Sequence, residues 1–490
     1  MTESGPTDVP KSDVPPSGAG RRASVSRARR VDLLVGLAIL APTVVALSVG
    51  LVGGEDNPLA GPQPPTTSAL TSATMVCPGG LTGDDGPVRV TRTPDVPGGK
   101  LAVATAPAAR GASGSSTTKS GTAITVEQGS TVEVPSSTGP TVLDGRGAAA
   151  PGIAAGRDGE LAVPECRGPS YDEWLVGVGS SARYATTVEL VNPDDGDAVV
   201  DLALHDATGP VEEPALRGIE VPPHGVKRID LATAAPRAEA TAAHLTVVRG
   251  RVTATARNTW DPLGRGRVTT DFLPPDTDPS SSSLLLGVPD KPAQPTLQLA
   301  NPGEDEVRVS LRFVTEQSSF APTGAPEISV PPQAMETVDL AKLFKGATAE
   351  GVVGIEIEAS GPVASSFMAL SGDDLLLLAP APALDDPAAA VVPSGRKTLV
   401  LGGAERTGVV SVVSYDAAGK EIRSDKVEIG TDRAATLALP GEAVSVSVVA
   451  RTTRIQAVVL AATGGRKPGL ATLRVRPGEL RAQIPAVDPD

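Results

Sequence analysis

The sequence predicts an all-β protein with tandem Ig-like antiparallel β-sandwich modules behind one N-terminal transmembrane helix. Three observations lead to this expectation: short segments of apolar and polar alternation, turn residues at regular intervals, and a pattern that recurs at a fixed offset. Gly and Pro number 53 and 47 among 490 residues, and 2% of the residues are aromatic. The cores must therefore be built from small and β-branched side chains, which suit strands.

The first 54 residues predict a basic tail followed by a membrane anchor. Residues 1–30 carry a net charge of about +3 amid Pro, Ser and Gly, a composition typical of disorder. Within residues 31–54, the segment 33–54 has no charged residue and is long enough to cross the roughly 30 Å hydrocarbon layer. Because the arginines precede it, we expect a cytoplasmic N-terminus and an extracellular C-terminal ectodomain in the cell membrane.

A cleaved export signal is the alternative. Ala46-Leu47-Ser48 has the small-x-small form of a signal-peptidase site, and cleavage after Ser48 would release a secreted protein. Arg29-Arg30 also matches the start of a twin-arginine signal. The long apolar run beyond the cleavage site favours the uncleaved anchor.

The exported part is strongly acidic. Removing the tail's charge of about +3 from the total of −14 leaves about −17. Nucleic acid and anionic lipid are bound through Lys and Arg that neutralise phosphate, so we expect neither as a partner of the ectodomain.

Cys77 and Cys166, the two cysteines, both fall on the predicted outer side, where disulfides persist. We expect a bridge that closes a loop of about 90 residues and contributes up to roughly 4 to 5 kcal/mol in the chain-entropy model. Free thiols or a metal site are weaker alternatives, because a two-Cys site needs two more ligands and no His lies near either Cys in sequence.

Two regions precede the clearest pattern. Residues 55–76 are rich in Pro, Thr and Ser and predict an extended spacer. Residues 77–166 contain short alternating segments, interrupted by the Ala/Gly/Ser-rich stretch 104–121. They predict a degenerate, disulfide-closed β module with a thin core.

The rest of the chain repeats itself. The Asn-Pro turn at Asn192 recurs 109 residues later at Asn301, and Val-Pro-Pro at Val221 recurs at the same offset at Val330. Six or seven alternating segments in about 100 residues are typical of an antiparallel sandwich. A third, shorter unit lacks the Asn-Pro turn. We expect β-sandwich repeats at residues 167–280, 281–393 and 394–477, followed by a tail at 478–490.

Cys166, the entry Glu173-Trp174-Leu-Val-Gly177 and the downstream Asn-Pro turn together carry a family resemblance. The chain resembles an uncharacterised actinobacterial family of secreted or membrane-anchored proteins, the domain of unknown function 5719. The resemblance spans roughly Cys77 to Ala462. It implies a Gram-positive envelope location and a β-rich ectodomain, and it carries over no activity and no functional residues.

All three histidines belong to the first sandwich repeat, and the second repeat does not copy them. Structural or solvent-exposed histidines are therefore expected in preference to zinc ligands or catalytic bases. The histidines and their counterparts at the 109-residue offset are His205 and Val314, His224 and Gln333, and His244 and Val353.

Two acidic loops after the Asn-Pro turns are the candidate interaction loops. Calcium prefers such oxygen clusters, but neither loop has the spaced Asp-x-Asp-x-Asp-Gly pattern, so solvated turns are favoured and calcium stays an open alternative. Trp260 is the candidate for an exposed aromatic platform, although packing is the simpler expectation. The loop residues are Asn192, Asp194, Asp195 and Asp197, and Asn301, Glu304 and Asp305.

The sequence lacks the motifs of common catalytic sites. It has no Gly-x-Ser-x-Gly elbow and no phosphate-binding loop, so we expect no enzymatic activity, cofactor or metal. We expect a membrane-anchored extracellular scaffold or interaction protein of the cell envelope. Its partners would be the membrane, through residues 33–54, and an envelope protein or cell-wall glycan. A glycan- or cell-wall-binding accessory protein is the alternative, and an extracellular hydrolase a further one.

Overall fold

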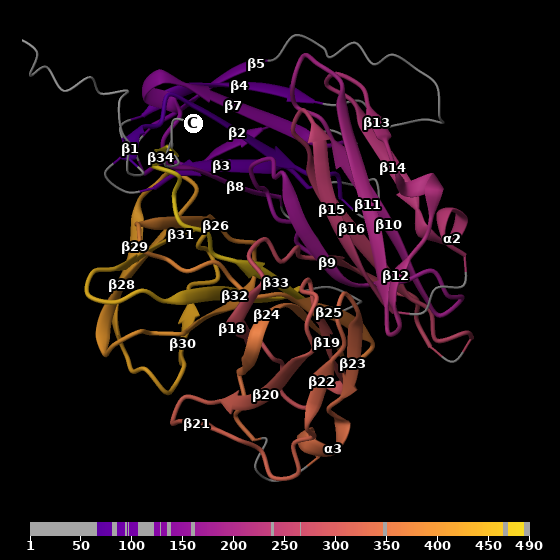
Figure 1. Cartoon of the computed structure of the whole chain (residues 1–490). Helices are drawn as coiled ribbons and strands as arrows, with labels where there is room; N and C mark the ends of the chain where they lie inside the picture. The colour runs from indigo at the N-terminus through magenta and orange to yellow at the C-terminus, as the bar shows by residue number, and fades with distance from the viewer. Residues whose placement is uncertain are drawn as a thin grey trace, which may run out of the picture. The chain divides into compact units, whose positions relative to one another are not determined.

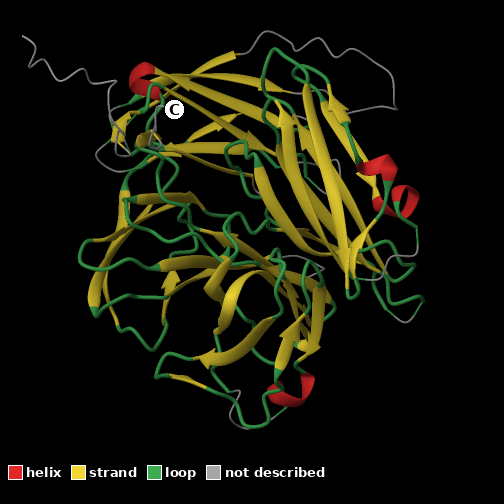
Figure 2. Cartoon of the chain, viewed as in Figure 1, coloured by secondary structure: helices red, strands yellow, loops and turns green. Residues whose placement is uncertain are grey.

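The computed structural model is nearly all antiparallel β-structure, as the sequence predicts (Figures 1 and 2). The predicted basic tail at 1–30 and the transmembrane helix at 31–54 lie outside the described residues. Within the described ranges, no helix is long and apolar enough to span a membrane. The structure describes residues 66–80, 86–93, 96, 98–105, 122–127, 129–134, 139–157, 162–236, 240–264, 266–345, 350–463 and 469–484.

The first group of strands, residues 72–157, forms two sheets with the orders β2-β7-β4-β5 and β6-β3-β8. Val90, Leu101 and Leu143 belong to its core. Before this group lies β1 (Thr66–Ala69), and a short 3-10 helix, η1 (Gly147–Ala149), follows β7. The strands are β2 (Ser72–Cys77), β3 (Val88–Arg92), β4 (Gly99–Thr105), β5 (Thr122–Val126), β6 (Val132–Val134), β7 (Thr141–Arg146) and β8 (Ile153–Arg157).

The spacer predicted for residues 55–76 ends earlier than expected. Strand β2 begins at Ser72 and pairs along its whole length with β7. Val76 is fully buried, and its backbone also exchanges hydrogen bonds with Arg167. Strand β2 therefore forms one edge of a sheet in the first group, despite the polar composition just before it.

The second group, residues 172–273, forms the sheets β12-β11-β15-β9, with β13 on β11, and β14-β10-β16-β17. Its core contains Leu190, Leu202 and Leu245. The elements are β9 (Asp172–Val178), β10 (Tyr184–Val191), β11 (Ala198–Asp206), β12 (Gly209–Val211), η2 (Pro214–Leu216), β13 (Ile219–Val221), β14 (Val226–Asp230), α2 (Leu231–Ala234), β15 (Thr241–Arg249), β16 (Thr253–Trp260) and β17 (Thr269–Leu273).

The third group, residues 280–378, is organised around one long strand. Strand β24 pairs with β18 and β20 in its first part and with β19 and β25 in its second part. The elements are β18 (Ser280–Leu286), β19 (Ala293–Ala300), β20 (Val307–Val314), β21 (Ser319–Phe320), β22 (Ile328–Val330), β23 (Met335–Asp339), α3 (Ala341–Phe344), β24 (Gly354–Ser371) and β25 (Asp374–Leu378).

The fourth group, residues 388–474, forms the sheets β26-β31-β28-β29 and β30-β27-β32-β33. Strand β26 pairs with β31, so this group begins before the predicted boundary at 394. The strands are β26 (Ala388–Val391), β27 (Arg396–Gly402), β28 (Gly408–Tyr415), β29 (Glu421–Ile429), β30 (Ala435–Leu439), β31 (Ser445–Ala450), β32 (Gln456–Thr463) and β33 (Gly469–Arg474), and β34 (Arg481–Ile484) follows within the predicted tail.

Alternation explains why these segments are strands. In β20, Val307, Val309, Leu311 and Phe313 are buried, while Arg308 between them is exposed. Successive side chains of a strand point to opposite faces, so this spacing places one apolar face on the core. The same parity holds in β28, whose Val410 and Val412 are fully buried.

Candidate functional site

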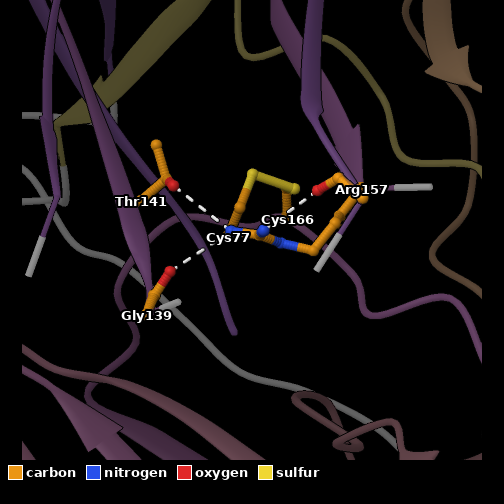
Figure 3. The surroundings of a disulfide bond; sticks show 6 residues. Cys77, Gly139, Thr141, Arg157 and Cys166 are labelled. Carbon is orange, nitrogen blue, oxygen red and sulfur yellow. Dashed lines mark hydrogen bonds between the residues drawn. A yellow bond between two sulfur atoms is a disulfide. The ribbon is translucent and has the colours of Figure 1, made fainter. Parts of the chain in front are cut away.

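The predicted disulfide between Cys77 and Cys166 is present, with an S–S distance of 2.04 Å. Both cysteines are buried in the core of the first group. Beside the bridge lies the buried guanidinium of Arg157, which donates hydrogen bonds to the Gly139 carbonyl and the Thr141 hydroxyl (Figure 3). The bridge fixes the segment around Cys166 to the end of β2.

Arg167, next to Cys166, joins the first group to the second. Its backbone exchanges hydrogen bonds with Val76 of β2, at 2.8 and 3.0 Å. Its guanidinium forms a 2.7 Å ion pair with Glu173 of β9 and donates to the Ala254 carbonyl of β16. Both charged side chains are almost fully buried.

Glu165, on the other side of Cys166, contacts the fourth group. Its two carboxylate oxygens accept hydrogen bonds from Arg474 at 2.6 and 2.7 Å, and Arg476 adds a contact at 3.2 Å. Burial by itself raises the pKa of Glu165, but the two arginines outweigh it and hold this pKa far below its usual range. Arg474 also donates to the carbonyls of Pro275 and Pro380, each at 2.8 Å.

Glu165, Arg167 and Arg474 lie where the groups of strands meet, and this region is called the junction. Three buried aspartates also belong to it. Asp276 accepts the backbone N–H of Ser365 at 3.0 Å, and Asp271 accepts that of Leu377 at 3.0 Å. Asp374 accepts the N–H of Leu470 at 2.9 Å. Burial raises the pKa of all three carboxyl groups. Side-chain acceptors thus satisfy strand N–H groups where strands of different groups meet.

Two of the three histidines flank Trp174. The ring of His244 stacks on Trp174 with centroids 4.3 Å apart, and His205 lies at 5.1 Å. His205 donates from Nδ1 to the Gln333 carbonyl of the third group at 2.8 Å. Trp174 clusters with apolar residues of the third group, including Met335. Trp174 and His205 therefore pack between two groups.

The Asn-Pro turn of the third group is an internally satisfied turn. The Asn301 amide donates to the carbonyls of Asp305, Val330 and Pro331 at 2.7, 3.1 and 3.1 Å. Its carbonyl oxygen accepts the N–H of Gly303 at 2.8 Å. Asn301 is 1% exposed, so this candidate interaction residue has no surface for a partner.

Asn192 in the second group makes the corresponding bonds. Its amide donates to the carbonyls of Gly196, Val221 and Pro222, and its oxygen accepts the N–H of Asp194. Asn192 is fully buried. Asn192, a candidate interaction residue by sequence, therefore holds its own loop in place.

The adjoining Pro-Pro turns also match. His224 and Gln333, at the same offset, both have left-handed backbone, with φ of 48° and 50°. His224 is thus a turn residue, and its ring lies 2.6 Å from an oxygen of Asp195. Left-handed backbone disfavours β-branched residues at both positions.

The carboxylates of the two candidate interaction loops differ in whether a basic side chain binds them. Asp194 is held by Arg251 through two hydrogen bonds of 2.6 and 2.9 Å. The Asp195 carboxylate is 99% exposed although His224 contacts it. Asp197, Glu304 and Asp305 are exposed. In the described part of the chain, no group of three or more His, Cys, Asp or Glu is placed to hold a metal ion.

Trp260 ends β16 and is half-buried against the core of the second group. The guanidinium of Arg183 lies over its ring at 5.8 Å from the centroid. The Arg183 guanidinium therefore covers one face of the indole.

These features define the class of the molecule: a nearly all-β protein with several antiparallel sheets and one buried disulfide. The model of a family of unknown function (DUF5719) matches residues 136–440. The chain belongs to this family, as the sequence resemblance indicated. No curated protein matches the chain significantly.

Proposed function

We propose that the protein is a membrane-anchored extracellular scaffold or interaction protein of the cell envelope, built from tandem Ig-like modules, without enzymatic activity. One observation carries this proposal: the buried charged side chains at the junction of the groups bind one another and strand backbones. Glu165, Arg474 and Asp276 are all engaged in this way. Buried charged side chains that hold modules together are expected in a protein that spaces or supports other components of the envelope.

Matched turns support the tandem modules. Asn192 and Asn301 form equivalent hydrogen bonds at a 109-residue offset, and the Pro-Pro turns after them share a left-handed residue. Two modules with one turn chemistry are expected from duplication of a β-sandwich unit. The third repeat, without the Asn-Pro turn, belongs to the same proposal.

The disulfide supports the extracellular location. Disulfides persist in oxidising compartments and are rare in the cytosol. Together with the uncharged segment 33–54 and the arginines before it, this favours an anchor whose C-terminal side faces outward. The origin in a Gram-positive envelope is part of this proposal.

The interaction role is tested with the exposed loop carboxylates. Purified full-length protein, immobilised in detergent, is incubated with solubilised envelope proteins and with cell-wall fragments. Replacing Asp195, Glu304 and Asp305 by Ser should weaken capture of a partner that uses these loops, while the unfolding midpoint stays close to that of the wild type. Capture unchanged by all three substitutions would remove the loops from the proposal.

The absence of catalysis is tested separately. Cell-wall polymers incubated with the purified protein should remain intact on chromatographic analysis. Turnover that a single Asp or Glu substitution abolishes would contradict the scaffold function and favour the hydrolase.

A further inference from the structure

A groove of about 580 Å³ lies at one end of the third group. It is formed where β19 begins, where β23 ends and where α3 follows. The backbone N–H of Leu340 donates to the Pro295 carbonyl at 2.9 Å and ties its two sides together. A volume of this size lies within the range of ligand sites, about 300 to 1,000 Å³.

The lining of the groove is half apolar and half polar, and its apolar part is rigid. Pro292, Pro295 and Phe344 line it. The Phe344 ring is held against Phe313, with ring centroids 4.7 Å apart, and against Phe367 at 6.2 Å. Aromatic packing of this kind leaves the ring few alternative positions, so the wall is formed before any ligand arrives.

The rim of the groove is positively charged in an acidic molecule. Lys291 and Lys345 line it and are exposed, and Lys342 is exposed on α3 beside it. Among the carboxylates that the structure describes, none lies within ion-pair distance of Lys291 or Lys345. Asp339 also lines the groove, where its carboxylate accepts the N–H of Ala341 at 2.8 Å, and Asp290 is exposed next to Lys291, so the three lysines exceed these two carboxylates by one charge. Against a total charge of −14, this rim is a local exception.

The backbone at the rim is unusual as well. Lys291 and Gln294 have φ of 50° and 52°, a left-handed conformation that non-Gly residues seldom adopt. The second group has Ala182 and Ala235 at the positions that correspond to Lys291 and Phe344. The Asn-Pro and Pro-Pro turns are present in both groups. Of the two, only the third group has a Lys and a Phe at these groove positions.

We propose that this groove binds an extended peptide segment of a partner protein, with an apolar side chain between two acidic residues. The apolar side chain would lie against Pro292 and Phe344, and the acidic side chains would pair with Lys291 and Lys345. Pro292 and Phe344 offer carbon surface to an aliphatic side chain, and Lys291 and Lys345 offer positive charge to acidic side chains on either side of it. The inference rests on the proposed interaction function and names its site and the chemistry of its partner.

The test uses full-length protein and fluorescent peptides of the pattern Glu-x-Leu-x-Glu, with Gln-x-Leu-x-Gln as the matched probe. At low ionic strength, the Glu peptides should bind at least about tenfold more tightly than the Gln peptides, and added salt should weaken them. The double variant Lys291→Glu and Lys345→Glu should lose this binding. The matched double variant Lys227→Glu and Lys420→Glu, also at exposed lysines, should retain it.

A second variant tests the groove without changing charge. Ala293 is exposed in the groove, so Ala293→Trp should fill it and reduce Glu-peptide binding at least about tenfold while thermal unfolding stays cooperative. Equal binding of Glu and Gln peptides, or binding unaffected by Ala293→Trp, would overturn the proposal. Binding of oligogalacturonate with no peptide binding would overturn it in favour of an acidic glycan. If envelope partners are captured equally by wild type and Ala293→Trp, the groove is excluded and the interaction function stands.

Discussion

At the scale of single residues, buried amides determine the turns. Asn301 has three carbonyl acceptors and one N–H donor around its side chain. Truncation to Ala would leave buried backbone groups without these partners, and each such group costs about 1 to 3 kcal/mol. The position therefore tolerates only a residue that both donates and accepts.

We predict that Asn301→Ala lowers the free energy of unfolding by about 2 to 4 kcal/mol. Urea titration followed by circular dichroism measures this loss. Asp305→Ser, four residues away and exposed, is the control and should leave the urea midpoint nearly unchanged. A loss of less than about 0.5 kcal/mol for Asn301→Ala would show that water replaces the amide.

Burial at His205 makes stability depend on pH. Desolvation lowers the pKa of His205, the Gln333 hydrogen bond opposes this, and His244 and Arg217 reinforce the lowering. Below about pH 6.5 the unfolded chain takes up a proton before the folded protein does. The contribution of His205 to the free energy of unfolding is therefore fully present above about pH 6.5. It falls as the pH drops toward the lower pKa of the folded state.

We predict that His205→Gln flattens the decrease in unfolding free energy between about pH 6.5 and 5. The Gln amide can still donate to the Gln333 carbonyl. Urea unfolding at several pH values in this interval measures the slope for both proteins. Equal slopes would mean that another group causes the acid sensitivity.

At the scale of elements, the segment around Cys166 joins three groups of strands. The disulfide holds it to β2, Arg167 holds it to β9 and β16, and Glu165 holds it to β33. Removing one partner of a buried ion pair costs about 3 to 5 kcal/mol, because the remaining charge stays buried. Glu165 and Arg474 are 10% and 5% exposed, so this cost applies to them.

We predict that Glu165→Gln lowers the free energy of unfolding by about 3 to 5 kcal/mol at neutral pH. Because the pKa of Glu165 is depressed in the folded state, the difference from wild type should persist at neutral pH and shrink as the pH falls below about 4.3. Glu405→Gln removes an exposed partner of Arg454 and serves as the control, with little expected change. Identical urea midpoints for Glu165→Gln and Glu405→Gln would contradict this assignment.

At the scale of the whole molecule, the proposed topology has a direct consequence. Intact cells treated with an external protease should lose the ectodomain and keep a short N-terminal fragment, because the membrane protects residues before the anchor. Immunoblotting with tags at both termini measures this. Recovery of a soluble protein starting at Val49 in the medium would replace the anchor with a cleaved signal.

Local patterns determined much of this protein. Alternation such as that in β20, together with Gly and Pro between the segments, predicts strands, because a strand that packs on a core must alternate. The fixed offset of Asn192 and Asn301 located two equivalent turns, and the cysteine count predicted the disulfide. Glu165 and Arg167, the charged neighbours of Cys166, are a local signal for the junction, but charge next to a cysteine does not by itself indicate which distant residues it will pair with.

Tertiary structure alone decided which side chains meet. Glu165 and Arg474 are 309 residues apart, and no periodicity links them. Trp174 is buried because the third group covers the outer face of β9. The groove at Phe344 exists because the start of β19, the end of β23 and α3 meet there. A strand's own sequence specifies which residues share a face, whereas the neighbour of that face depends on how complete sheets pack.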